Sequence, residues 1–218
     1  MKQLLNKKLL LLFLLLLGVA LHSQNIENIY IHMPDRLNPT TTAKIRMEML
    51  EYHKAGQGDT IQNRFGGKTI LQVFDTLNSR IVVKNTATST FEMKLMKIED
   101  NLAIGVIRSV CGSICQSLTE FYDTAWTKIP VQFTMPKAIE WLAKNKLDSV
   151  VGLDKDWVQK ALENNFVSLR FDAATTSIIA TNNSADFLSE ADRKIIQPLL
   201  RNNEIVYQLE GRRWIQKP

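Results

Sequence analysis

The sequence predicts an α+β fold in which N-terminal helices precede a mostly antiparallel β-meander, followed by a C-terminal strand pair, a helix and closing strands. Apolar residues recur at spacings of three and four between residues 26 and 55, the period of a helix that faces a core. From Lys68 the pattern changes to short runs rich in Ile, Val, Leu, Phe and Thr, which are typical of strands. No repeat or Gly/Ser-rich linker interrupts the chain, so we expect a single α+β domain over residues 24–218.

Two helices are expected at the start of this domain. The first covers Ile26–Met33 and ends there, because the residue before Pro34 avoids the helical conformation. Asn38 then has the position of an N-cap, with Pro39 at the first position of the second helix. Gly56 is placed to end that helix.

The strands of the meander follow as short apolar runs separated by Asn, Asp, Ser or Gly. We expect them at Thr69–Asp75, Arg80–Lys84, Thr90–Ile98, Leu102–Val110 and Leu118–Tyr122. In the third of these runs, Phe91, Met93 and Leu95 alternate with Glu92 and Lys94. This alternation predicts that one face of the strand is buried and the other is wet.

The C-terminal third predicts short helices near residues 138–142 and 157–162, with no clear pattern over residues 144–156. Phe166–Phe171 and Ser177–Ala180 are expected to form a strand pair. Ser189 and Asp192 resemble a capping box at the start of a helix. The closing strands are expected at Ile205–Leu209 and around Trp214, where two arginines would protect a sheet edge.

Residues 1–23 are typical of a cleavable signal peptide. Lysines at positions 2, 7 and 8 precede an apolar run from Leu9 to Leu21. As a helix this run spans about 20 Å, less than the roughly 30 Å hydrocarbon core of a bilayer. We therefore expect cleavage after Ser23, a mature protein that begins at Gln24 without a transmembrane span, and a secreted or periplasmic location in the cell envelope.

The charge balance argues against a nucleic-acid partner. The whole chain carries 27 Lys+Arg and 22 Asp+Glu, a net charge of +5. Removal of the three lysines of the signal peptide leaves 24 against 22, a net charge of +2. A mature protein so close to neutrality lacks the electrostatic footprint of nucleic-acid binding.

Cys111 and Cys115 are the most distinctive local feature, because three residues separate them between two expected strands. A hairpin with so short a loop brings the flanking residues to Cα separations near 5 Å, a distance that a disulfide can bridge. We expect a structural disulfide that persists in an oxidising compartment. The alternative is a thiol redox or metal-carrying role, which would require a lowered thiol pKa or additional ligands.

The sequence contains no recognisable catalytic motif. The histidines that remain after cleavage, His32 and His53, lie outside any such motif. Gly66–Lys68 resembles the end of a phosphate-binding loop, but Gln62 stands where that loop requires glycine. We expect no cofactor and no metal, and favour a non-enzymatic role. The alternative is an unrecognised hydrolase with His32 or His53 beside a carboxylate in a concave pocket.

Several segments resemble an uncharacterised family of secreted proteins from Bacteroidales, a domain of unknown function. They are Ile29–Leu37, Gly66–Lys68, Val110–Cys115, Phe121–Asp123 with Trp126, and Phe187–Arg193. The resemblance covers essentially the whole mature chain. It implies a compartment and a lineage, but no catalytic residues.

The lineage implied by this resemblance suggests a modification. Envelope proteins of such bacteria are often O-glycosylated where Asp precedes Ser or Thr and a small or aliphatic residue. The matching hydroxyl residues are Thr60, Thr76, Thr124 and Ser149. The alternative explanation is that Asp and Thr gather at turns, where their side chains bind nearby backbone groups.

Taken together, these features predict a secreted or periplasmic envelope protein that acts as a binding module without catalysis. Its expected partner is an envelope protein or a glycan. The sequence does not specify the ligand.

Overall fold

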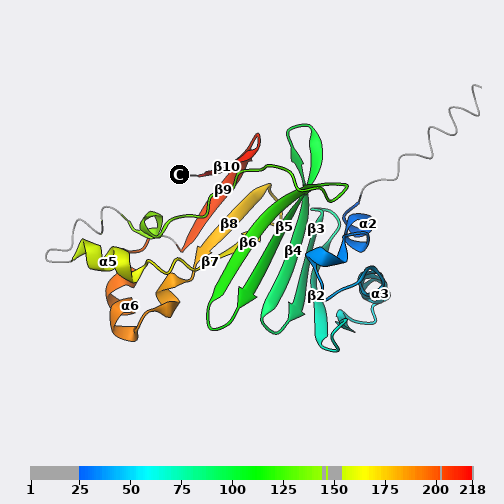
Figure 1. The fold of residues 1–218 in the computed structure, drawn as a ribbon, viewed down its shortest axis with the longest axis horizontal. Coiled ribbons are helices and arrows are strands. Elements are labelled where there is room, and N and C mark those ends of the chain that lie inside the picture. The colour runs from blue at the N-terminus through cyan, green and yellow to red at the C-terminus, as the bar shows by residue number, and fades with distance from the viewer. Residues whose placement is uncertain (1–24, 144–145, 147–153, 202, 218) are drawn as a thin grey trace, which may run out of the picture.

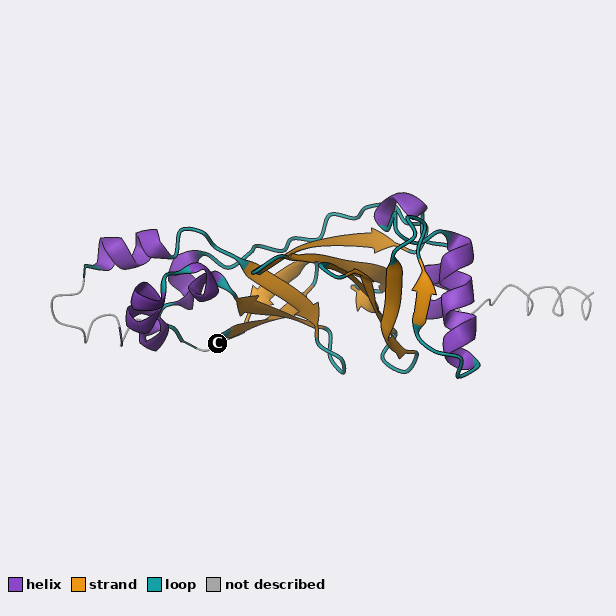
Figure 2. Cartoon of the chain, turned by 90° about the horizontal axis from the view of Figure 1, so that it is seen from below, coloured by secondary structure: helices purple, strands orange, loops and turns teal. Residues whose placement is uncertain are grey.

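The computed structural model describes residues 25–143, 146, 154–201 and 203–217. Two antiparallel sheets occupy the middle of an elongated molecule, with helices at both ends (Figures 1 and 2). The fold is therefore α+β, as predicted. None of the helices in the described part of the chain is both long and apolar enough to cross a membrane.

The first sheet is a meander, because each strand pairs with the next along the chain. Its strands are β1 (Thr60–Gln62), β2 (Lys68–Asp75), β3 (Arg80–Thr86), β4 (Ser89–Ile98), β5 (Asn101–Cys111) and β6 (Cys115–Asp123). Strands β2 to β6 lie where the sequence predicts strands. The short strand β1 was not predicted, because three residues are too few to show an alternating pattern.

The second sheet has the order β10-β9-β8-β7. Its strands are β7 (Val167–Phe171), β8 (Ser177–Asn182), β9 (Glu204–Glu210) and β10 (Arg213–Gln216). The predicted strand pair is β7 with β8. The two closing strands extend this pair, because β9 pairs with β8 and β10 pairs with β9. Strand β10 is the edge strand of the sheet, as Arg212 and Arg213 predict.

Four α-helices and four short 3₁₀ helices are described. They are α2 (Ile26–Ile31), η1 (Asp35–Leu37), α3 (Ala43–Lys54), η2 (Ala138–Trp141), α5 (Lys155–Ala161), η3 (Ser184–Phe187), α6 (Glu190–Ile196) and η4 (Gln197–Leu199). The predicted capping box is present, since Ser189 Oγ accepts a hydrogen bond from the Asp192 amide at 3.1 Å. Most of the stretch that shows no clear pattern, residues 144–156, lies outside the described residues.

The predicted start of the second helix is wrong by several residues. Thr42, not Asn38, is its N-cap. Asn38 is buried, and its side-chain amide donates to Asn85 Oδ1 at 3.0 Å. The carbonyl of Thr41 accepts from the buried Arg46 guanidinium. These tertiary contacts hold the segment before Thr42 out of the helix.

Both faces of the first sheet are buried, so the molecule has two cores. On one face, Phe91, Met93 and Ile104 pack with residues of α2 and α3 such as Tyr30 and Met49. On the other face, residues such as Met96, Ile107 and Phe121 belong to a core with the second sheet, α5 and α6.

The prediction that Glu92 and Lys94 face water is wrong, because the second sheet covers them. Glu92 is 6% exposed and Lys94 is 4% exposed. Glu92 Oε1 accepts from Arg80 Nε at 2.7 Å and from the Phe171 amide at 3.1 Å. Lys94 Nζ donates to three carbonyls of the β7–β8 turn, at residues 172, 173 and 175, over 2.6 to 3.0 Å.

Side chains of the first sheet also close the free edge of β7. The Leu169 amide donates to Ser117 Oγ at 2.9 Å, and the Phe171 amide donates to Glu92. These acceptors stand where a further strand would pair. An edge strand with its amides already bound is protected from pairing with another chain.

Candidate functional site

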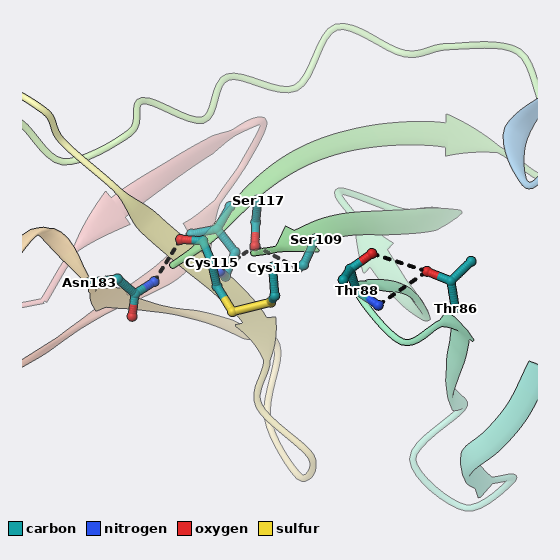
Figure 3. The surroundings of a disulfide bond; sticks show 8 residues. Thr86, Thr88, Ser109, Cys111, Cys115, Ser117 and Asn183 are labelled. Atoms are coloured by element: carbon teal, nitrogen blue, oxygen red, sulfur yellow. Dashed lines mark hydrogen bonds between the residues drawn. A yellow bond between two sulfur atoms is a disulfide. The ribbon is translucent and has the colours of Figure 1, made fainter. Parts of the chain in front are cut away.

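The structure brings Cys111 and Cys115 together as predicted. The two residues are directly opposite in the β5–β6 register, their Cα atoms are 4.0 Å apart, and their sulfur atoms lie at disulfide-bonding distance. Both are half-buried at the tip of the hairpin. Figure 3 shows this tip between the β3–β4 turn and the second sheet.

Hydrogen bonds anchor the hairpin tip on both sides. The Cys115 carbonyl accepts from Asn183 Nδ2 at 2.9 Å, and the Cys111 amide donates to the Thr88 carbonyl at 2.7 Å. Next to the cysteines, the Ser109 and Ser117 hydroxyls are 2.6 Å apart, and Ser117 also binds the second sheet. The cysteine pair therefore lies within a structural junction.

The two histidines have different partners, and neither lines a cavity described for this chain. His32 is exposed, and its Nδ1 lies 2.9 Å from the Asn28 carbonyl. His53 Nδ1 lies 2.6 Å from Asp59 Oδ1, and this pair is partly exposed. Among the described residues, no group of three or more His, Cys, Asp or Glu side chains gathers in a metal-binding arrangement.

The four candidate glycosylation residues are scattered. Thr60 is exposed on β1, and Thr76 is exposed in the β2–β3 turn. Thr124 is half-buried directly after β6. Ser149 lies outside the described residues.

A cavity that sequence reasoning missed lies at the end of the first sheet opposite the cysteine hairpin. Its volume is about 310 Å³. It is lined by Ile98, Asn101, Leu102, Ala103, Asp123, Thr124, Ile129 and Arg212. The buried side chains of Ile98 and Ala103 form its apolar floor. The polar lining residues form its rim, and they are Asn101, Asp123, Thr124 and Arg212. Three larger cavities are described, of about 650 Å³ beside α5, about 710 Å³ beside β9 and about 540 Å³ beside α6, and exposed side chains make up most of their lining.

Three tight turns converge around this 310 Å³ cavity. Glu99, in the β4–β5 turn, has a φ of 56°, and Trp126, in the loop after β6, has a φ of 62°. Gly211, in the β9–β10 turn, has a φ of 59°. Positive φ is uncommon for residues other than glycine, and for a bulky residue such as Trp126 it requires surrounding structure to hold it. Trp126 is buried against Tyr122, with ring centroids 5.7 Å apart.

The loop after β6 fixes the position of Asp123. Its Oδ1 accepts hydrogen bonds from the Ala125 amide at 2.9 Å and from the Thr127 amide at 2.8 Å. Its backbone amide donates to the Thr127 carbonyl at 2.9 Å. All the hydrogen bonds described for the carboxylate use Oδ1, so Oδ2 remains available to a ligand.

Arg212 provides the opposite charge. Its Nε donates to Glu99 Oε2 at 3.1 Å, and about half of each side chain is exposed. Its carbonyl accepts from the Gln132 amide at 2.8 Å, which fixes the backbone of the turn. A guanidinium has five N–H donors, so the contact with Glu99 orients Arg212 without occupying its terminal nitrogens.

Only one part of this cavity, the turn after Asp123, corresponds to a recognisable sequence pattern. An Asp followed by Thr, Ala, Trp and Thr at the end of a strand is compatible with a turn that binds its own backbone. Glu99 and Arg212 are 113 positions apart, and no local pattern relates them.

Comparison with known proteins places the chain in a family. The family model described as "Protein of unknown function (DUF3256)" matches residues 18–214. The chain belongs to this family. The family carries no assigned activity, and a search of curated proteins found no match.

A solved structure has the same fold. It is a domain of an uncharacterised protein from Porphyromonas gingivalis W83, with a TM-score of 0.71 and 14% sequence identity. The match covers 88% of this chain and 98% of the other. At this sequence identity the similarity shows that the two chains share a fold, and it shows nothing about the activity of this chain.

Proposed function

We propose that this member of the family is an exported envelope protein that binds a small ligand in the 310 Å³ cavity, without catalysis. The observation that carries the proposal is the convergence of three tight turns around a polar rim and an apolar floor. Ligand sites combine apolar walls with a few positioned polar groups, in cavities of roughly 300–1,000 Å³. A volume of about 310 Å³ favours a small molecule.

The rim is built for recognition because its polar groups are held in place before a ligand arrives. Asp123 is fixed by two backbone amides and Arg212 by Glu99. Preorganised groups lose little conformational entropy on binding, and this lowers the cost of association. The N-terminal signal-like segment supports export, and the Cys111–Cys115 pair is consistent with an oxidising compartment.

A thermal-shift experiment on residues 24–218 tests the proposal. The probes are L-amino acids, N-acetylated hexosamines and short dicarboxylates. A ligand at 100 times its Kd stabilises a protein by about 2.7 kcal/mol, which for a chain of this size raises Tm by roughly 5–10 °C.

Thr124→Phe, at the rim, should abolish the rise in Tm because the aromatic ring fills the mouth of the cavity. Ser113→Phe, in the exposed tip of the cysteine hairpin, is the control and should retain it. The proposal is wrong if no probe class raises Tm, or if the rise survives in Thr124→Phe.

A further inference from the structure

We propose that the ligand of the 310 Å³ cavity is a free α-amino acid with an apolar side chain. This inference rests on the proposed function, since it names the ligand class of the same site. It follows from an acidic and a basic group that face one small cavity with an apolar floor.

The acidic side of the cavity suits an ammonium group. Asp123 Oδ1 is occupied by the amides of Ala125 and Thr127. Oδ2 can therefore accept from a ligand without loss of those hydrogen bonds. A charge-assisted hydrogen bond of this kind is roughly twice as strong as a neutral one.

The basic side suits a carboxylate. The terminal nitrogens of Arg212 present a planar pair of donors that matches the two oxygens of a carboxylate. The contact between Arg212 and Glu99 is partly exposed, with relative side-chain exposures of 51% and 47%. The contact uses only Nε, so a ligand carboxylate can bind the terminal nitrogens while Glu99 keeps its place.

The floor and the size of the cavity select the rest of the ligand. Ile98 and Ala103 are 3% and 1% exposed, and Ile129 completes an apolar surface beside them. Asn101 and Thr124 add neutral polar groups at the rim. No aromatic side chain lines this cavity, so the stacking platform that suits a sugar ring is absent from its described lining. A small zwitterion with an aliphatic side chain satisfies each of these groups.

Titration of residues 24–218 with L-leucine and two analogues tests the inference, with backbone amide NMR as the readout. The analogues are 3-methylbutylamine, which lacks the carboxylate, and 4-methylpentanoate, which lacks the ammonium. N-acetylglucosamine is the neutral probe. We expect L-leucine to shift the signals of Asn101 and Ala125, and each analogue to bind on the order of 10-fold more weakly or worse.

Two variants separate the charges. Asp123→Asn keeps an Oδ1 acceptor for the loop amides, so the loop should stay folded while affinity for L-leucine falls on the order of 10-fold. Affinity for 4-methylpentanoate should not fall. Arg212→Gln should show the reverse selectivity, losing affinity for L-leucine but not for 3-methylbutylamine. Asp100→Asn and Arg213→Gln change the same charges outside the cavity lining and should bind L-leucine as the unaltered protein does.

The outcomes distinguish the inference from the proposed function. If L-leucine binds equally well to Asp123→Asn and Arg212→Gln, or does not shift the cavity signals, the amino-acid inference is wrong. If N-acetylglucosamine shifts those signals instead, the inference is overturned while the cavity remains a binding site. Failure of every probe class in the thermal-shift experiment overturns both.

Discussion

Gly105, in β5 of the first sheet, lies directly against Phe171 of the second sheet, and it shows how a single residue limits their spacing. A Cβ atom added there would lie 2.6 Å from Phe171 Cζ and 2.7 Å from Met96 Cε. Phe171 is 1% exposed and belongs to the core between the sheets, so neighbouring side chains enclose its ring. Glycine in the middle of a strand commonly marks such a close approach.

We predict that Gly105→Ala lowers the free energy of unfolding by about 1–3 kcal/mol through overpacking. Urea denaturation measures it. Gly112→Ala is the control, because no atom lies within 4 Å of the added Cβ there, and it should change stability by less than about 0.5 kcal/mol. In the Gly105→Ala background, Phe171→Leu should cost less than it does alone, since both changes act on one contact. Equal stability of the two alanine variants would contradict this account.

Glu92 predicts a pH dependence of stability. Burial raises the pKa of Glu92, and the Arg80 guanidinium opposes this only in part. The folded state therefore binds the proton more tightly than the unfolded state, in which the pKa of a Glu side chain is about 4.3. The contribution of Glu92 to stability falls as the pH rises from about 4.3 to the folded pKa.

Glu92→Gln should remove this pH dependence while it keeps an acceptor for the Phe171 amide. The measurement is the unfolding free energy of both proteins from pH 4 to 7. As the pH rises, the unfolding free energy of the variant should increase relative to that of the unaltered protein. A constant difference would show that Glu92 titrates alike in both states.

At the scale of elements, Lys94 joins β4 to the β7–β8 turn. Desolvation lowers its pKa, and Asp172 opposes the shift. We predict that Lys94→Met costs about 1–3 kcal/mol, because three turn carbonyls lose their donor while the packing of the aliphatic chain is kept. Hydrogen exchange should show faster opening around residues 172–175. Lys97→Met, at an exposed position near the end of the same strand, should leave stability and exchange unchanged. Equal effects of the two variants would refute the role of Lys94.

The cysteine hairpin carries the second prediction at this scale. A Cys111→Ser/Cys115→Ser variant should lose on the order of 2 kcal/mol because the closed loop is short. With a total stability of about 5–15 kcal/mol the variant should remain folded. The redox alternative is decided by the reduction potential of the pair. A value below about −300 mV indicates a structural bridge, and a value near −200 mV would indicate labile thiol chemistry.

At the scale of the whole molecule, export and modification stay predictions that one measurement can test. The intact mass of protein isolated from its native cell should equal that of residues 24–218 plus any glycan. Glycan is expected first at Thr60 and Thr76, whose side chains are exposed. A retained N-terminal segment would contradict export by cleavage. A mass without added hexose would contradict glycosylation.

Elements that depend on local pattern were predictable from the sequence. The first helix begins directly after its cap, Asn25, at the predicted residue Ile26, and the helix of the predicted capping box begins after Ser189. The five main strands of the first sheet have nearly the predicted bounds. The cysteine hairpin followed in the same way, because its two strands and its loop are contiguous. Periodicity, turn chemistry and short spacings act over a few residues, and those are visible in one sequence.

The contacts between distant segments were decided by the tertiary structure alone. Alternation in β4 indicated one buried face but could not show that a second sheet covers Glu92 and Lys94. The cavity also depends on such distant contacts, because Asp123 ends β6 of the first sheet and Arg212 lies in the β9–β10 turn of the second. The physical reason is that a local pattern reports how a segment meets solvent or core, whereas the partner that covers its other face comes from elsewhere in the chain.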